Sequence, residues 1–305
     1  MQSRRFPTPL SAGARIGLVS PSGPLRDATD LEQAIANVRV FGWEPVVGNY
    51  VLERDGYLAG SDEQRVADLN RFARDESIDA IWCLRGGYGA MRLLDAIDYD
   101  ALAKRPRAII GYSDITALHA AIGQCANMIT FHGPTARGEL TTLTRDSFAR
   151  ALSPTNDSKM LARGGMTTLA GGSATGRLVG GNLALVSGLV GTPYAWELDG
   201  AILVLEDVSE QVYRLDRMLT QLRLTGALAR VAGIAFGNFT DIPEDATNVD
   251  RSLDRVLREI AESTGVPCVM NFPIGHLPDH VTLPLGAIAE LNADNGGSLI
   301  VQDWP

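Results

Sequence analysis

Short apolar segments alternate with longer amphipathic segments through the first half of the chain. The apolar segments have the length and β-branched content of buried strands, and the amphipathic ones repeat apolar residues at helical spacing. The expected strands are 15–20, 44–48, 78–84 and one beginning at 108, and the expected helices are 30–41, 61–74, 90–97 and one ending near 124. Regular alternation of this kind predicts a parallel sheet with helices on both faces.

The pattern loosens between about 140 and 175, where Ser, Thr, Gly and Pro are scattered without a clear period. This change predicts an N-terminal α/β domain over 1–150, a linker over 151–175 and a C-terminal domain over 176–305. The elements expected after the linker are helices following 182, at 213–222 and at 252–262, strands at 201–205, 231–236 and 268–271, and short antiparallel strands within 281–301. The C-terminal domain is therefore expected to be mixed, with its own core.

The composition is that of a globular protein that binds neither nucleic acid nor membranes. The 305 residues are 45% hydrophobic and 21% charged, with a formal net charge of -9. Such an acidic chain argues against binding to nucleic-acid phosphates, which depends on clustered Lys and Arg. The sequence contains no segment typical of a signal peptide or of a transmembrane helix. We therefore expect a cytoplasmic protein.

Three cysteines, Cys83, Cys125 and Cys268, are odd in number and far apart. Each has apolar neighbours, which favours buried reduced thiols over disulfides or a metal site. The chain contains neither a Cys-x-x-Cys nor a His-Glu-x-x-His segment. We expect catalysis without a metal or cofactor.

Ser113 follows the apolar strand that begins at 108 and precedes a helical segment. A serine between a strand and a helix is the arrangement of the nucleophile elbow of serine hydrolases. The match is partial, because Gly111 is present but Ile115 occupies the position of the second glycine. The alternative is that Ser113 is only the N-cap of the helix, a position at which serine is common.

A glycine-rich turn at 85–89 follows the preceding strand, so it is expected at the same edge of the sheet as Ser113. It lacks the third glycine of a dinucleotide-binding loop, because Arg92 stands at that position, and the chain has no Gly-Lys-Ser or Gly-Lys-Thr segment. We therefore interpret the turn as a source of a backbone amide for an oxyanion, with the amide of Asp114 as the second donor.

Four histidines are candidates for the base that a serine nucleophile requires, and they differ in position. His119 lies within the helix after Ser113, and His280 precedes the strand that begins at 281. His132 and His276 both follow strands, and their positions alone favour neither.

The carboxylate that would orient the base is expected at the end of the strand 201–205. Glu206 is the first candidate, because so apolar a strand rarely ends in a carboxylate without a function. Asp207 and Glu210 could take the same role. Alternatively, Glu206 forms an ordinary ion pair with Arg214 or Arg217.

Five segments, in this order, give the chain a resemblance to the LD-carboxypeptidases of serine peptidase family S66, the muramoyltetrapeptide carboxypeptidases. They are Gly17-Leu18-Val19-Ser20-Pro21-Ser22-Gly23, Arg85-Gly86-Gly87-Tyr88-Gly89, Gly111-Tyr112-Ser113-Asp114, Leu205-Glu206-Asp207 with Tyr213, Asp216-Arg217 and Leu222, and Gly275-His276 with Leu283-Pro284-Leu285-Gly286. The resemblance implies a flavodoxin-like N-terminal domain, a smaller β-rich C-terminal domain and a homodimer.

The resemblance also assigns roles to residues of this chain. Ser113 corresponds to the family's nucleophile, Glu206 to its acid and His276 to its base, while the amides of Gly87 and Asp114 correspond to its oxyanion hole. After His276 this chain departs from many members, because Leu277-Pro278-Asp279-His280 replaces a segment with Gly and Asn.

The implied activity is removal of the terminal D-Ala from murein tetrapeptides in cell-wall recycling. One alternative is a microcin C immunity-type peptidase of the same fold, which would need aromatic surfaces near the site to stack a base. Trp196 and Trp82 are present, but Trp82 lies within an expected buried strand and is interpreted as a core residue. Another is a non-catalytic protein that binds a small ligand. Arginines suit a planar carboxylate, so the candidates for holding the substrate's carboxylate are Arg85, Arg137 and Arg177.

Overall fold

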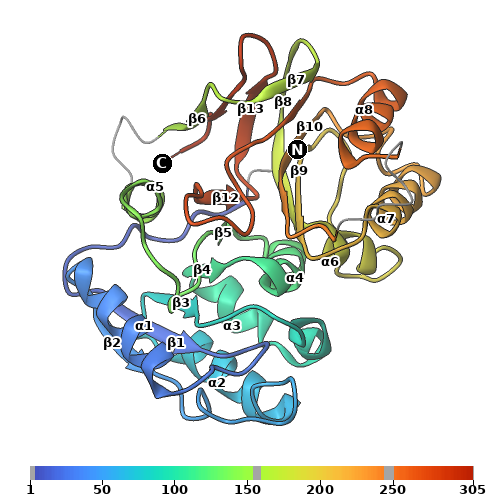
Figure 1. Ribbon diagram of the computed structural model, residues 1–305. Coiled ribbons are helices and arrows are strands. Elements are labelled where there is room, and N and C mark those ends of the chain that lie inside the picture. Colours follow the sequence, from blue (N-terminus) through green and yellow to red (C-terminus); the bar gives the residue numbers. More distant parts are fainter. Residues whose placement is uncertain (1–3, 154–158, 244–250, 305) are drawn as a thin grey trace.

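Two sheets organise the chain in the computed structural model, which describes residues 4–153, 159–243 and 251–304 (Figure 1). The first sheet has the strand order β12-β5-β4-β3-β1-β2. Its strands are β1 (Arg15–Val19), β2 (Glu44–Val47), β3 (Ala80–Cys83), β4 (Ala108–Gly111), β5 (Thr130–His132) and β12 (Leu283–Leu285). Strands β1 to β5 are parallel, in the order 2-1-3-4-5 that is typical of flavodoxin-like folds. The predicted fold class is confirmed.

Helices connect these strands, and their termini follow local sequence signals. They are α1 (Ala28–Val40), α2 (Asp62–Arg74), η1 (Ala90–Ala96), α3 (Tyr99–Lys104), η2 (Ser113–Ile115), α4 (Thr116–Ala126) and α5 (Thr142–Leu152). A capping box begins α2, because Ser61 accepts a hydrogen bond from the amide of Gln64 and the Gln64 side chain accepts one from the amide of Ser61. The segment expected as a helix at 90–97 is a 3-10 helix instead.

The second sheet has the order β6-β14-β13-β8-β9-β10-β11-β7. Its strands are β6 (Met160–Arg163), β7 (Thr167–Ala170), β8 (Ser173–Asn182), β9 (Ile202–Val208), β10 (Gly233–Thr240), β11 (Cys268–Met270), β13 (Ile288–Asn292) and β14 (Ser298–Val301). Helices α6 (Leu183–Gly188), α7 (Val212–Leu224) and α8 (Leu253–Thr264) lie along one side of it in Figure 1. Strands β8 to β11 are parallel, and the remaining strands pair antiparallel.

The segment 151–175 corrects the linker prediction. It carries β6, β7 and the first residues of β8, all of which belong to the second sheet. The short strands within 281–301 are present, but β12 leaves the second half of the chain and pairs with β5 in the first sheet. The buried apolar residues of both halves consequently form one continuous cluster rather than a separate core for each.

The structure corrects one expectation about the cysteines. Cys83 and Cys268 are buried free thiols as expected, whereas Cys125 is exposed near the end of α4.

In the described ranges, every helix is too short or too polar to cross a membrane.

Candidate active site

Ser113 has a strained backbone conformation at the point where β4 ends. Its φ is +64°, a left-handed value that is uncommon for residues other than glycine. Such strain persists where surrounding structure imposes it, and it is a recurrent property of nucleophile elbows. The side chain is partly exposed, so a substrate can reach the hydroxyl.

The alternative that Ser113 is an ordinary N-cap does not fit this geometry. The residue that precedes η2 is Tyr112, and Ser113 is the first residue of η2 itself. No side-chain hydrogen bond caps η2 or α4. The serine is therefore placed without the capping contact that would explain it as a structural residue.

The glycine turn after β3 packs directly against Ser113. A Cβ atom added to Gly86 would lie 3.0 Å from the Cβ of Ser113, so only glycine fits this approach. The Asp114 carboxylate accepts a hydrogen bond from the amide of Ala90 at 2.8 Å, which ties the end of the glycine turn to the elbow. Gly87 is an exposed residue, and Asp114 lies in the first turn of η2, where helix amides have no acceptor within the helix. The glycine turn and the elbow that carry these two amides are thus packed together.

Glu206 is positioned through a contact between the two sheets. It lies in β9, opposite Asn182 of β8. The amide of Asn182 donates to the Thr116 hydroxyl at 3.0 Å, and Thr116 begins α4 just after the elbow. This short path joins the strand that carries Glu206 to the turn that carries Ser113.

Glu206 and His276 form the central polar contact of the site. Nδ1 of His276 lies 2.9 Å from Oε2 of Glu206, and the Glu206 side chain is fully buried. His276 retains 19% side-chain exposure, and its ring packs against Tyr112 with centroids 4.9 Å apart. Tyr112 is the neighbour of Ser113, so the imidazole is adjacent to the elbow. Among the described residues, no hydrogen bond joins His276 to Ser113; such bonds often tighten only when substrate binds.

The loop that carries His276 is held from two directions. Asn238 of β10 donates to the carbonyls of Phe272 and Ile274 at 3.1 Å. On the other side, the Thr144 hydroxyl of α5 donates to the carbonyl of Pro278 at 2.9 Å. The Leu277-Pro278-Asp279-His280 segment therefore docks on α5. Helix α5 was not expected from the sequence, so this support for the histidine was missed.

The other carboxylates considered have structural contacts instead. Asp207 is buried and accepts hydrogen bonds from the Asn182 side chain and from the amides of Ala184 and Val208, at 2.8 to 2.9 Å. Burial raises the pKa of Asp207 to about 6. Glu210 pairs with Arg214 at 3.6 Å. Glu206 is thus the carboxylate that the structure brings to a histidine.

The remaining histidines are core residues. His119 is buried and lies 2.9 Å from the carbonyl of Gly111, and burial lowers its pKa to about 4. His132 is fully buried in β5, and burial lowers its pKa well below the usual value. Burial also lowers the pKa of His280 to about 4. His276 is therefore the accessible histidine of this group.

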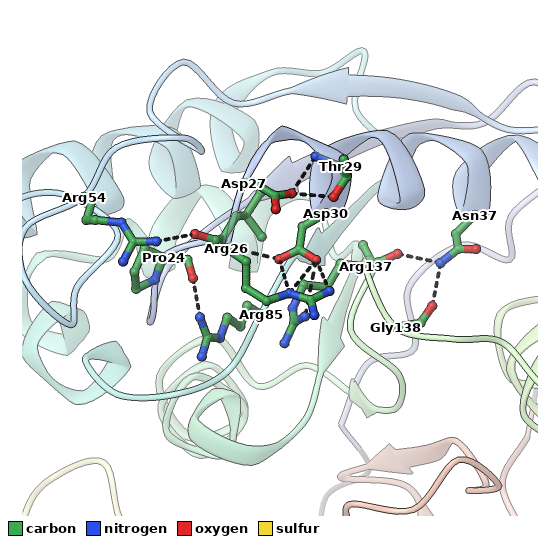
Figure 2. A network of polar contacts seen from close by, with 12 residues as sticks. Pro24, Arg26, Asp27, Thr29, Asp30, Asn37, Arg54, Arg85, Arg137 and Gly138 are labelled. Carbon is green, nitrogen blue, oxygen red and sulfur yellow. Dashed lines mark hydrogen bonds and ion pairs between the residues drawn. The ribbon is translucent and has the colours of Figure 1, made fainter.

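Two of the three candidate arginines lie close to the elbow and one does not. Arg85 and Arg137 gather near Asp30 (Figure 2). Arg177 is buried in β8 and pairs with Glu197 at 3.2 Å. Both tryptophans proposed for base stacking are buried, Trp82 against Pro134 and Trp196 beneath Arg4.

An exposed aromatic pair went unnoticed in the sequence. Tyr88 of the glycine turn and Tyr57 are 54% and 69% exposed, with ring centroids 5.5 Å apart. Aromatic residues are scattered along the chain without a pattern that predicts the pair. The position of Tyr88 in the turn at 85–89 was the one sequence feature that indicated an exposed side chain.

Comparison with known proteins identifies a family for both halves of the chain. The N-terminal domain of the LD-carboxypeptidases, peptidase family S66, matches residues 16–133, and the C-terminal domain of that family matches residues 175–291. The chain belongs to the LD-carboxypeptidase family. It is accordingly a serine-type carboxypeptidase, as predicted.

Curated LD-carboxypeptidase relatives match this chain over nearly its whole length. The probable murein peptide carboxypeptidase of Bacillus subtilis is 35% identical, over 94% of this chain and 91% of the relative. The murein tetrapeptide carboxypeptidase of Pseudomonas aeruginosa is 36% identical, over 92% of this chain and 94% of the relative.

Solved structures of the family share the architecture. The muramoyltetrapeptide carboxypeptidase from Oxalobacter formigenes aligns with a TM-score of 0.84 and 29% identity, over 96% of this LD-carboxypeptidase chain and 100% of the other. The microcin C7 self-immunity protein MccF in complex with glutamyl sulfamoyl guanosine aligns with a TM-score of 0.89 and 26% identity, over 98% of both chains. The fold alone does not separate these two kinds of relative.

Proposed function

We propose that this LD-carboxypeptidase releases the terminal D-Ala of murein tetrapeptides through an acyl-enzyme formed on Ser113. The observation that carries the proposal is the 2.9 Å contact between His276 Nδ1 and Glu206 Oε2. A carboxylate on Nδ1 fixes the proton there and leaves Nε2 to accept the proton of the nucleophile. The names of the Pseudomonas and Bacillus relatives support murein peptides as the substrate class.

The first half of the proposed reaction forms the acyl-enzyme. His276 removes the proton of the Ser113 hydroxyl as its oxygen attacks the carbonyl carbon of the L,D amide. Negative charge develops on the carbonyl oxygen, where the amides of Gly87 and Asp114 donate hydrogen bonds to it. The imidazolium, stabilised by Glu206, then protonates the nitrogen of the departing D-Ala, and the C–N bond breaks.

Water completes the proposed cycle. His276 accepts a proton from the water as its oxygen attacks the ester carbon, and the same two amides hold the second oxyanion. The ester bond to Ser113 breaks, the serine oxygen regains its proton from the imidazolium, and the shortened peptide leaves. The cytoplasmic recycling of cell-wall fragments and the homodimer stay predictions of the resemblance.

Hydrolysis of an aminoacyl nucleotide-like amide is the second candidate. The similarity to MccF favours it, and so does the exposed pair of Tyr57 and Tyr88 beside Gly87, because an exposed aromatic ring can stack on a base. The buried Trp82 and Trp196 cannot serve that purpose.

One experiment separates the two candidates. Purified protein is incubated with L-Ala-γ-D-Glu-meso-diaminopimelate-D-Ala and, separately, with glutamyl sulfamoyl adenosine, and products are followed by mass spectrometry. We expect release of D-Ala and slow or undetectable hydrolysis of the adenosine compound. Hydrolysis of the adenosine compound alone would contradict the proposed substrate and favour the second candidate.

A further inference from the structure

Four arginines and one buried aspartate form a cluster at the start of α1 (Figure 2). In this arginine cluster Arg26 and Arg137 pair with Asp30, while Arg85 and Arg54 lie next to them on the side of Pro24. Asp30 is 2% exposed and pairs with Arg26 at 2.6 Å and with Arg137 at 3.5 Å. The hydrogen bond from Arg26 lowers the pKa of Asp30 to about 2, so this carboxylate is ionised.

Cationic charge exceeds anionic charge in this cluster. In the described part of the chain, Arg54 and Arg85 pair with no carboxylate and donate instead to the carbonyls of Leu25 and Pro24. The Nε atom of Arg137 is buried and has no hydrogen-bond acceptor. The nearby Asp27 carboxylate accepts from Thr29, the ordinary contact of a helix N-cap. The buried carboxylate of Asp30 thus pairs with two of the four guanidinium groups, and the excess of positive charge suits an additional anion.

Two of these arginines follow the strands that flank β4 in the sheet. Strand β4, which leads to Ser113, lies between β3 and β5. Arg85 follows β3, and Arg137 follows β5. The amide of Ala136 donates to the carbonyl of Cys83 at 2.9 Å, which draws the segment before Arg137 across the end of β3 and toward Arg85. The two guanidinium groups therefore approach each other next to the elbow.

One contact connects the cluster to the reacting groups, because Gly86, the neighbour of Arg85, is the residue that packs against Ser113. Burial raises the pKa of Tyr112, which precedes Ser113 and packs against His276, and the positive charge of Arg137 is near enough to oppose this shift. An open surface cavity of about 450 Å³ adjoins Arg26 and Arg137, so an anion can reach the cluster from solvent.

We infer that Arg85 and Arg137, with Asp30 holding Arg137, bind the terminal carboxylate of the substrate and thereby make the enzyme a carboxypeptidase. This inference rests on the proposed function. In a peptide, a single carbon separates the terminal carboxylate from the scissile nitrogen, so its binding residues must lie beside the nucleophile and the oxyanion donors. Arg85 and Arg137 meet that requirement. Arg177 does not, because it lies in β8 of the second sheet and pairs with Glu197. Bidentate pairing with a planar carboxylate is what guanidinium groups provide.

The test compares the tetrapeptide with the same tetrapeptide carrying a C-terminal amide. kcat/KM is measured on both substrates for the wild type, Arg85→Gln, Arg137→Gln and the charge-retaining Arg137→Lys. Arg74→Gln is the matched control, because Arg74 forms a surface ion pair with Asp98 at the C-terminal end of α2, away from the elbow. Circular dichroism confirms that each variant is folded.

We expect each Arg→Gln variant to lose roughly 10- to 100-fold in kcat/KM on the free acid and little on the amide, which is the range of a charge-assisted hydrogen bond. Arg137→Lys should retain part of the preference for the acid, and Arg74→Gln all of it. Equal losses on both substrates would overturn this inference but not the proposed function, because the arginines would then act only on the fold. Failure of the wild type to cleave either peptide would overturn the proposed function and this inference with it.

A third substrate tests the side-chain carboxylate of diaminopimelate. Lysine in place of diaminopimelate removes the side-chain carboxylate but keeps the terminal one. The inference expects the variants to lose the same factor on this peptide as on the parent. An effect of the substitutions that disappears with lysine would overturn the assignment to the terminal carboxylate.

Discussion

His276 Nδ1 lies 2.9 Å from the buried Oε2 of Glu206, although the two residues are 70 positions apart in the sequence. Neither partner is placed by its own strand alone. Glu206 is fixed by pairing of β9 with β8 and by the Asn182 contact to α4, and His276 by a loop held between Asn238 and α5. The contact therefore depends on support from both sheets, and the catalytic predictions depend on the contact.

Replacing Glu206 with glutamine should reduce kcat strongly and leave KM nearly unchanged. The amide keeps the size of the side chain but no longer stabilises the imidazolium or selects its tautomer. A decrease of about 10⁴-fold in kcat is the scale expected for the acid of a triad. Glu210→Gln, which alters an ion pair with Arg214, is the control and should keep wild-type kcat. Retention of a tenth or more of wild-type kcat in Glu206→Gln would contradict its role.

Asp207→Asn should affect stability more than catalysis. Asp207 accepts three hydrogen bonds from donors that include the amide of Ala184 in the first turn of α6. An amide side chain cannot accept all of them, and the loss is expected to cost about 1–3 kcal/mol of unfolding free energy. Urea denaturation measures this cost, and D-Ala release by the folded variant should stay within a few-fold of wild type. A loss of activity as large as that of Glu206→Gln would show that the wrong acid has been assigned.

The position of Ser113 could be predicted from sequence because it depends on local signals. An apolar strand, a glycine and a helix follow one another within a few residues, and the structure adds the left-handed backbone that the pattern implies. The choice between His132 and His276 could not be made in the same way. Both follow strands, and only the return of β12 to the first sheet, beside β5, shows that His132 is fully buried while His276 is not.

The segment 140–175 was misread for a different reason. Helix α5 has threonine, serine and arginine at many positions, and its stability comes from the burial of residues such as Phe148 and Leu152 and from the Thr141 cap. Strands β6 and β7 lie at the two ends of the second sheet and alternate only weakly. Tertiary packing determines such elements, and short-range periodicity does not reveal it.

Gly86→Ala should reduce activity with little loss of stability. The new methyl group would lie 3.0 Å from the Cβ and 3.2 Å from the Oγ of Ser113, so the nucleophile must shift. Small displacements of reacting groups can cost about 100-fold in rate. Gly188→Ala is the control, because its methyl group would meet only ordinary contacts, at 3.8 Å from Met91. Wild-type kcat in Gly86→Ala would contradict the close packing of the glycine turn on the elbow.

The buried histidines should make the protein less stable as the pH falls from about 6.5 to 4. Burial lowers the pKa of His119 from 6.5 to about 4, so the unfolded chain takes up a proton in this range that the folded protein does not. Unfolding free energy therefore decreases with falling pH, by roughly 3 kcal/mol from this residue. His119→Gln removes the titrating group and can still donate to the Gly111 carbonyl.

Urea denaturation of wild type and His119→Gln at a series of pH values tests this point. The difference between the two curves isolates His119, because all other titrating groups are shared. We expect the stability of the variant to decrease less steeply between pH 6.5 and 4. Parallel curves over that range would contradict a buried, neutral His119.

Release of D-Ala from L-Ala-γ-D-Glu-meso-diaminopimelate-D-Ala, followed by mass spectrometry for the wild type and Ser113→Ala, tests the central claim most directly. Ser209→Ala is a matched control, because Ser209 also has a left-handed backbone, with φ of +59°, but is not the first residue of a helix. The account predicts that the wild type and Ser209→Ala release D-Ala and that folded Ser113→Ala does not. Undiminished release by Ser113→Ala would contradict the assignment of Ser113 as the nucleophile.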